Sequence, residues 1–154
     1  MSEYTATVRW QRGEQAFADD TYSRGHSWEF DGGAVVPASA SPDIVPVPMS
    51  VAENVDPEEA FVASISSCHM LFFLSIAARR GFIIDDYTDN ACGIMSKIEK
   101  GKTAMTRVTL YPAASYSGVN RPTATEIDKM HHRAHEMCFI ANSIKTEVDI
   151  AVVS

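Results

Sequence analysis

The pattern of apolar and polar residues divides the first third of the chain into strand-like segments and one long loop. Residues 4–10 alternate between an apolar and a polar face, which predicts a half-buried strand. Residues 27–36 predict a hairpin that turns at an Asp-Gly-Gly run. Five of the seven prolines lie between residues 37 and 57. We therefore expect an extended loop there, of a length that is often functional.

A long helix is predicted over residues 56–80. Asp56 suits the N-cap, Pro57 suits the first helical position, and Glu59 completes a capping box. Gly81 marks the end of the helix, because glycine accepts the left-handed conformation that follows many helices. The middle of the helix is apolar on nearly all sides, so we expect it to be buried at the centre of the fold.

Strand-like segments follow this helix. Residues 87–98 and 103–111 predict two strands joined by a Glu-Lys-Gly-Lys turn. Residues 113–117 indicate a third strand in the same region.

The last part of the chain predicts a second helix and a final strand. The helix runs from Thr123, which begins another capping box, to about Met137. Residues 145–153 alternate again and predict a strand. Strands, helix, strands, helix and strand in this order predict an α+β fold with mostly antiparallel sheet. A length of 154 residues is typical of one domain, residues 1–154.

The charge balance and the cysteines narrow the class of protein. The chain has 20 acidic and 13 basic residues and a net charge of −7, the opposite sign from a general nucleic-acid binder. Its 3 cysteines are far apart, which suits a reducing cytoplasm better than a secreted disulfide framework. The N-terminal residues are charged, and the longest apolar run contains several polar residues. We therefore expect a cytoplasmic protein with no membrane or nucleic-acid partner.

Two of the cysteines are candidate reactive groups. Cys68 lies in the middle of the first predicted helix, and Cys138 directly follows the second. Free cysteine is among the most buried residues, so an inert core thiol is one interpretation of Cys68. The sequence leaves open whether the two thiols meet in space. Cys92 lies on a predicted strand, where we expect a structural role.

The histidines suggest a second kind of site. His131 and His135 are four residues apart on the second predicted helix, a spacing that can bind a metal, with Cys138 as a further ligand. The run is not HExxH, and we expect instead a polar helix face whose imidazoles titrate. His69 follows Cys68 directly and points about 100° away on a helix, so it is not a ready general base.

The runs DPEEAFVASISSCHMLFFLSIAARRG and HHRAHEMCFIANSIKTEV resemble the two signature regions of the OsmC/Ohr family of thiol-dependent organic hydroperoxide reductases. The first is similar to the family's helix start, with a cysteine ten residues beyond the first glutamate. The second is similar to the family's second-cysteine motif. The resemblance covers the whole chain. It implies an OsmC-like fold, in which sheets wrap around a buried central helix in an intertwined homodimer.

The resemblance also implies roles for individual residues. Cys68 would be the peroxidatic cysteine, and Cys138 would resolve its sulfenic acid through an intramolecular disulfide. A thiolate in apolar surroundings needs a nearby cation, which in the family is an arginine held by a glutamate. The glutamate corresponds to Glu58. For the arginine we choose Arg24, with Arg12 as the rival.

The resemblance further implies the reaction partners. The substrate would be an organic hydroperoxide, and the reductant a dithiol such as a lipoylated protein, in defence against oxidative or osmotic stress. No nucleotide, flavin, haem or metal motif is visible, so we expect neither cofactor nor metal. Phe139 follows Cys138 where many relatives have proline, which changes how this segment approaches Cys68.

Helix geometry separates Glu58 from Cys68 of its own chain. The two are ten residues apart on one predicted helix, which corresponds to roughly 15 Å along the axis and roughly 80° around it. Both residues can serve one site only if they come from two chains. This predicts a homodimer with composite sites.

An apolar wall lies on the helix around Cys68, formed by Phe61, Ile65, Leu71 and Phe72. It is either core packing or the mouth of a pocket, to which His26 would be added. As a pocket it would favour a peroxide with an organic tail. The alternative function is a binding protein that holds an apolar ligand and whose cysteines do not turn over.

Overall fold

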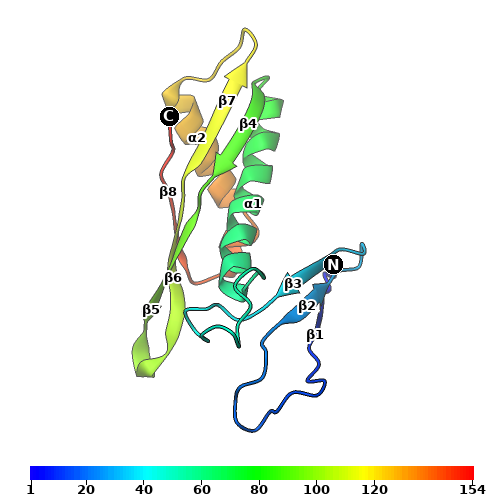
Figure 1. Cartoon of the computed structure of the whole chain (residues 1–154). Helices are drawn as coiled ribbons and strands as arrows, with labels where there is room; N and C mark the ends of the chain where they lie inside the picture. Colours follow the sequence, from blue (N-terminus) through cyan, green and yellow to red (C-terminus); the bar gives the residue numbers. More distant parts are fainter. The chain divides into compact units, whose positions relative to one another are not determined.

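The structure is a computed structural model that describes all 154 residues. The chain divides into two compact units, Met1–Ala60 and Phe61–Ser154 (Figure 1). The first helix, α1 (Pro57–Arg79), begins in the first unit and continues into the second. That the whole chain is a single domain stays a prediction.

The first unit contains a small antiparallel sheet. Its strands β1 (Thr7–Arg9), β2 (His26–Glu29) and β3 (Val35–Ala38) lie in the order β1-β2-β3. The predicted hairpin is confirmed, with its turn at the Asp-Gly-Gly run, where Gly33 has a φ of 93°. The predicted strand at residues 4–10 is confirmed only for its three paired residues, and the expectation that it is half-buried is wrong, because all three are exposed.

The proline-rich segment after β3 folds back onto that strand. The buried Ser39 accepts a hydrogen bond at its Oγ from the backbone N–H of Val51, at 2.9 Å. Val55 pairs with Ala38 as an isolated parallel bridge, and Asn54 donates to the Ala38 carbonyl at 3.0 Å. The C-terminal part of the loop is therefore attached to the end of β3.

Helix α1 begins at the predicted capping box. Asp56 Oδ1 accepts from the backbone N–H of Glu59 at 2.8 Å, and Glu59 Oε2 accepts from the backbone N–H of Asp56 at 3.2 Å. The helix ends where predicted, and Gly81 follows with a φ of 79°. Local sequence signals therefore place both ends of this helix.

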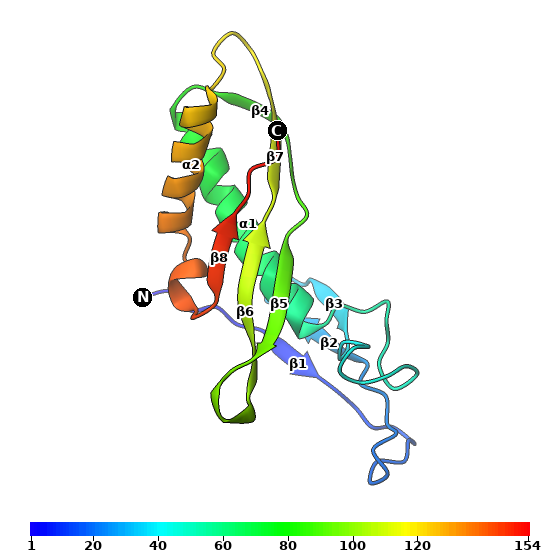
Figure 2. The same ribbon diagram turned by 90° about the vertical axis from the view of Figure 1, so that its left-hand side faces the viewer.

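The second unit contains two sheets (Figure 2). Strands β4 (Ile83–Asp89) and β7 (Pro112–Ser117) form an antiparallel pair. Strands β5 (Cys92–Lys97), β6 (Thr103–Leu110) and β8 (Glu147–Ile150) lie in the order β5-β6-β8. The predicted hairpin is confirmed as the antiparallel pair β5–β6, with the short 3-10 helix η1 (Glu99–Gly101) in its turn, whereas β6 and β8 are parallel.

The prediction of one strand over residues 87–98 is wrong. The strand is interrupted at residues 90–91, and the two parts, β4 and β5, belong to different sheets. Asp89 lies at the break, where its carboxylate accepts from the backbone N–H of Tyr111 at 2.6 Å and from the hydroxyl of Ser66. These partners are distant in the sequence, so the local pattern does not show the break.

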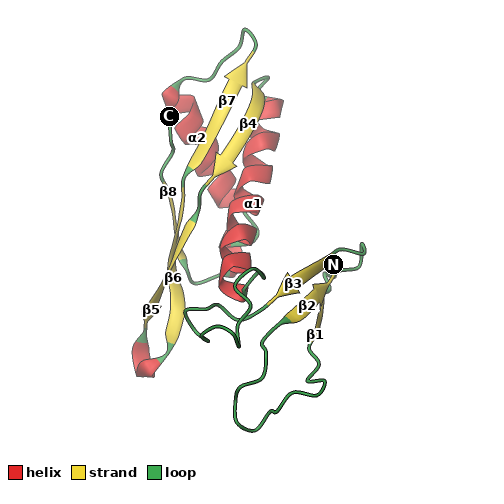
Figure 3. Ribbon diagram, viewed as in Figure 1, coloured by secondary structure: helices red, strands yellow, loops and turns green.

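The second helix is α2 (Ala124–Met137) (Figure 3). The predicted capping box at its start is confirmed. Thr123 Oγ1 accepts from the backbone N–H of Glu126 at 3.2 Å, and the Glu126 carboxylate accepts from the N–H of Thr123 at 3.1 Å. After α2 the chain makes a short 3-10 helix, η2 (Ala141–Ser143), and enters β8.

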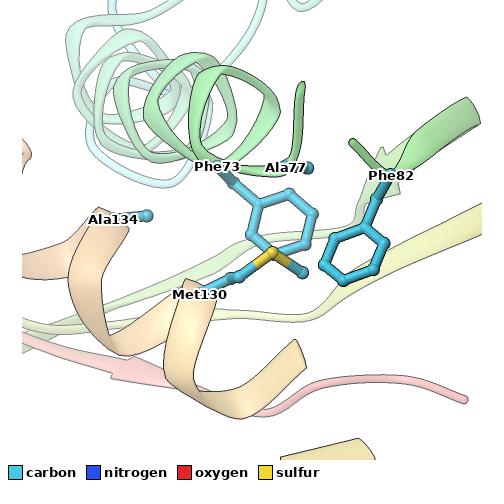
Figure 4. Close-up of a cluster of buried hydrophobic side chains, with 5 residues drawn as sticks. All are labelled: Phe73, Ala77, Phe82, Met130 and Ala134. Carbon is cyan, nitrogen blue, oxygen red and sulfur yellow. The ribbon is translucent and has the colours of Figure 1, made fainter. Parts of the chain in front are cut away.

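Two apolar clusters form the core of the second unit. The first joins α1 to α2, with Phe73 pointing from α1 toward Met130 on α2 (Figure 4). The second joins α1 to the sheet, where Ile65 packs with Val108 and Leu110 of β6. Helix α1 therefore packs against both α2 and the β5-β6-β8 sheet.

Within one chain, α1 buries only part of its apolar surface. Its buried residues form a single stripe of every fourth residue: Ile65, His69, Phe73 and Ala77. Leu71, outside this stripe, is 60% exposed. By length and composition alone the helix could also cross a membrane. The expectation of a helix buried on all sides is therefore not met by one chain, because one chain covers only one of its faces.

Candidate active site

The structure brings the two candidate cysteines together within the second unit. Cys68 lies half-buried on α1, and Cys138 is the C-cap residue of α2 with 1% of its surface exposed. The pKa of the Cys138 thiol is raised, mainly by burial and in addition by the adjacent Cys68 thiol. The backbone N–H of Ala141 donates to Cys138 Sγ at 3.4 Å and opposes this shift. The site therefore has one accessible and one buried thiol.

The chain after Cys138 is held against α1 by an aromatic pair. Phe139, the residue directly after Cys138, packs edge-on against Phe72 with ring centroids 5.0 Å apart. Phe72 lies one turn beyond Cys68 on α1. The backbone N–H of Asn142 donates to the Cys138 carbonyl at 3.0 Å, which closes the turn. Phe139 is therefore compatible with an approach of Cys138 to Cys68.

Glu58, in the first unit, has an unpaired buried oxygen. Its side chain is half-buried, and Oε2 has no hydrogen-bond partner in the chain. A buried acceptor without a donor costs free energy, more so when it carries a charge. Glu58 is therefore a ready acceptor for a cationic group from outside the chain.

The two candidate arginines differ in how firmly they are held. Arg24 has a side chain only 15% exposed, pairs with Asp20 Oδ1 at 2.7 Å and lies over the ring of Tyr22 at 3.7 Å. Arg12 is exposed and donates to the Gln15 carbonyl at 3.0 Å. Neither guanidinium is paired with a glutamate in this chain. Arg24 is the more ordered of the two candidates.

Three of the four predicted pocket residues make other contacts. His26 has both ring nitrogens occupied, by the Arg24 carbonyl at 2.7 Å and by the indole N–H of Trp28 at 3.1 Å. Ile65 is fully buried against the sheet, so its assignment to the pocket is wrong because no surface remains for a substrate. Phe61 packs against the same cluster. Phe72 stays a pocket candidate, since it lies beside Cys68.

A buried histidine pair joins the two helices, and sequence reasoning missed it. His69 Nε2 and His131 Nδ1 are 2.9 Å apart, and the two rings are parallel. Only 1% of His69 and 3% of His131 is exposed. The pKa of each ring is lowered to about 4, chiefly by burial; His135 contributes to the lowering at His69, which Asp89 opposes, and His69 contributes at His131.

The expectation that His131 titrates on a polar helix face is therefore wrong. The ring of Phe73 stacks on that of His131 with centroids 4.0 Å apart, in the apolar contact between α1 and α2. His132 is the exposed neighbour and pairs with Glu136. One signal could have found the pair. Ile127, His131, Ala134 and Cys138 recur at the spacing of a buried helix face.

Other polar atoms near this pair also lack partners. His69 Nδ1, His135 Nδ1 and the hydroxyl of Tyr87 are buried without a hydrogen bond. Burial and the nearby Asp89 raise the pKa of Tyr87. No three histidine, cysteine or carboxylate side chains are grouped so that they could hold a metal ion. The metal alternative at His131, His135 and Cys138 is thus not formed as a cluster in this structure.

Comparison with known families places the chain. Residues 51–153 match the family described as OsmC-like protein. Because this match spans most of the chain, the protein belongs to the OsmC-like family. No curated protein matches it.

Solved structures agree with this assignment. An OsmC-like protein of unknown function from Vibrio cholerae is 58% identical, with a TM-score of 0.98 over 99% of this chain and 100% of that one. An organic hydroperoxide resistance protein from Elizabethkingia anophelis is 18% identical, with a TM-score of 0.68 over 98% and 95% of the two chains. The organic hydroperoxide resistance protein OhrB of Bacillus subtilis is 17% identical, with a TM-score of 0.67 over 98% and 96%. The last two likenesses show the fold.

Proposed function

We propose that the protein is a cysteine-based peroxidase that reduces organic hydroperoxides. The observation that carries this proposal is the pair of adjacent free thiols, Cys68 and Cys138, one accessible and one buried. Family membership and the fold shared with organic hydroperoxide resistance proteins support it.

The difference in exposure supports distinct roles for the two thiols. Cys68 is the thiol that a hydroperoxide can reach, and its thiolate attacks the peroxide oxygen, giving a Cys68 sulfenic acid and an alcohol. The Cys138 thiol condenses with the sulfenic acid, which forms a disulfide and releases water. A dithiol, such as a lipoyl group, then reduces the disulfide by thiol–disulfide exchange and is itself oxidised.

We propose that the working form is a homodimer with composite sites. Glu58 and Cys68 are separated by roughly 15 Å along one helix, so Glu58 of one chain would hold the arginine that serves Cys68 of the other. The unpaired Oε2 of Glu58 supports this, because it lacks the donor that such an arginine would supply. The uncovered face of α1 supports it as well, because Leu71 lies there 60% exposed among small residues such as Ser67 and Ser75.

The preference for organic hydroperoxides rests on the aromatic pair beside Cys68. Phe72 and the 70%-exposed Phe139 present apolar surface next to the reacting thiol. An alkyl or aryl tail that covers this surface gains binding free energy, which hydrogen peroxide does not. Reduction of such peroxides in the cytoplasm would give the protein a part in oxidative or osmotic stress defence.

A turnover assay tests this function. Purified protein is mixed with dihydrolipoamide and either cumene hydroperoxide or hydrogen peroxide, and peroxide consumption is followed. We expect faster turnover of cumene hydroperoxide, loss of activity in Cys68→Ser, and wild-type activity in the matched control Cys92→Ser, whose thiol is exposed and distant from the pair in sequence. Equal activity of the wild type and Cys68→Ser would contradict the proposal. The protein would then be better described as a binding protein for an apolar ligand.

A further inference from the structure

The interior of the contact between α1 and α2 is apolar apart from one buried hydrogen bond. At the edge of the contact, Arg80, directly after α1, pairs with Glu126 of α2 at 2.7 Å, and both side chains are partly exposed. Phe73 and Ala77 of α1 pack against Met130 and Ala134 of α2 (Figure 4). Apolar packing is non-directional, so such a contact by itself discriminates weakly between neighbouring registers of two helices. The bond between His69 and His131 is the buried directional element in this contact, since the Arg80–Glu126 pair is open to solvent and such pairs contribute little.

The unpaired atom of His69 indicates which ring donates. His69 Nδ1 is buried without a partner, and an N–H at that position would be a buried donor left unsatisfied. The favoured arrangement therefore has His69 donating from Nε2, with His131 accepting at Nδ1. Both imidazoles are then neutral, and the N–H proton of His69 Nε2 forms the hydrogen bond to His131.

A buried polar pair is seldom the most stable filling for an apolar contact. Replacing both partners of such a bond by apolar groups of similar shape is often nearly neutral. The best-attested use of such a pair is to fix register, as a single buried polar residue does between coiled-coil helices. His69 and His131 lie where a register error would have a chemical consequence.

That consequence concerns the two cysteines. Cys68 is next to His69 on α1, and Cys138 follows His131 by seven residues, about two turns, on the same face of α2. A slip of α2 along α1 by one turn would move Cys138 by about 5.4 Å relative to Cys68. A disulfide requires Cα atoms within about 7 Å, so such a slip would separate the pair.

We propose that the His69–His131 hydrogen bond is a positioning contact, which fixes the register of α2 on α1 and thereby holds Cys138 against Cys68. This inference rests on the proposed function only in taking Cys68 and Cys138 as the reacting pair. Both histidines act through the cysteines and touch no substrate. The contact should therefore change disulfide formation more than it changes the stability of the fold.

The test measures disulfide formation without peroxide. Full-length protein in a Cys92→Ser background is equilibrated with glutathione, where oxidised glutathione takes two electrons from the two thiols and leaves one protein disulfide and two reduced glutathiones. Peptide mapping gives the fraction linked Cys68–Cys138. Thermal unfolding of the reduced protein gives the stability of the same variants.

Three variants distinguish positioning from simple packing. The double variant His69→Leu/His131→Leu removes the bond and fills the space with apolar atoms. His131→Asn keeps an acceptor close to the position of Nδ1, and His131→Leu removes it. We expect the double variant to fold but to lose about tenfold in the disulfide equilibrium constant, and His131→Asn to recover most of that loss.

Each result decides the matter. An unchanged equilibrium constant in a folded double variant overturns the inference, and so do equal constants in His131→Asn and His131→Leu if the double variant does not fold. A wild-type protein that forms no Cys68–Cys138 disulfide in glutathione overturns the cysteine pair and this inference together. A wild-type protein that forms the disulfide but does not consume hydroperoxide overturns the peroxidase alone.

Discussion

Phe139 packs edge-on against Phe72, with ring centroids 5.0 Å apart, one turn beyond Cys68 on α1. The residue directly after Cys138 therefore attaches the Cys138 segment to the helix of Cys68. Aromatic pairs of this kind contribute about 0.5–1.5 kcal/mol beyond their burial.

Replacement of Phe139 should slow disulfide closure and leave the first oxidation unchanged. In Phe139→Ala the Cys138 segment loses its contact with Phe72, so we expect closure to slow by up to about tenfold. Rapid mixing with one equivalent of cumene hydroperoxide, acid quench and mass analysis separate the two steps. Phe30→Ala, a partly exposed phenylalanine in the β2–β3 turn, is the matched control. Equal closure in both variants would argue against the contact.

Structural features formed by neighbouring residues could be predicted from the sequence, whereas contacts between distant residues could not. The capping boxes at Asp56 and Thr123 were predicted correctly, because each is formed within four consecutive residues. The break after Asp89 was missed, since its carboxylate is bound by Ser66 and Tyr111, which lie more than twenty residues away.

The candidate site, too, was predictable from the sequence only in its local features. The sequence places Cys68 and Cys138 on two helices, but only the packing of α1 on α2 shows that the thiols are adjacent. The local sequence favoured a polar face for His131, because His132, His135 and Glu136 are all close to it along the helix. Its burial depends on a ring from α1, which the local sequence does not reveal.

Acid should destabilise the fold through the buried histidine pair. Burial lowers the folded-state pKa of His69 and His131 from an ordinary value of 6.5 to about 4. The unfolded chain therefore binds more protons between these values, so stability is full above about pH 6.5 and falls as the pH is lowered toward 4. We expect a loss on the order of 1–3 kcal/mol, measured by urea unfolding across this range.

The same measurement on the double variant gives the control. His69→Leu/His131→Leu has no imidazole at this contact, so its stability should depend less on pH over the same window. A wild-type protein as stable at pH 4.5 as at pH 7 would contradict the burial of two neutral imidazoles.

Glu58 should matter for the reaction with peroxide and not for the fold. Glu58→Gln removes the charge that would hold an arginine near the reacting thiol. Since hydrogen bonds to charged groups contribute about 1.5–3 kcal/mol, we expect oxidation of Cys68 to slow by about tenfold to a hundredfold. Glu53→Gln, at an exposed glutamate of the preceding loop, should have no effect. Similar rates for the two variants, by rapid-mixing oxidation, would remove Glu58 from the site.

The uncovered face of α1 should be a contact between two chains. Leu71→Asp places a charge in the middle of this face, so we expect the variant to be monomeric by light scattering while wild type has twice the chain mass. The fully exposed Val119, in the turn before α2, provides the control Val119→Asp. A wild-type protein that is monomeric at micromolar concentration would contradict the composite site.

The central claim is that peroxide converts Cys68 and Cys138 into a disulfide. The most direct test is the intact mass of the fully reduced protein before and after one equivalent of cumene hydroperoxide, followed by peptide mapping. We predict the loss of two hydrogens with a Cys68–Cys138 link. A gain of one oxygen on Cys68 would keep the peroxidatic role and remove Cys138 as its resolving partner. No change in mass would contradict the account.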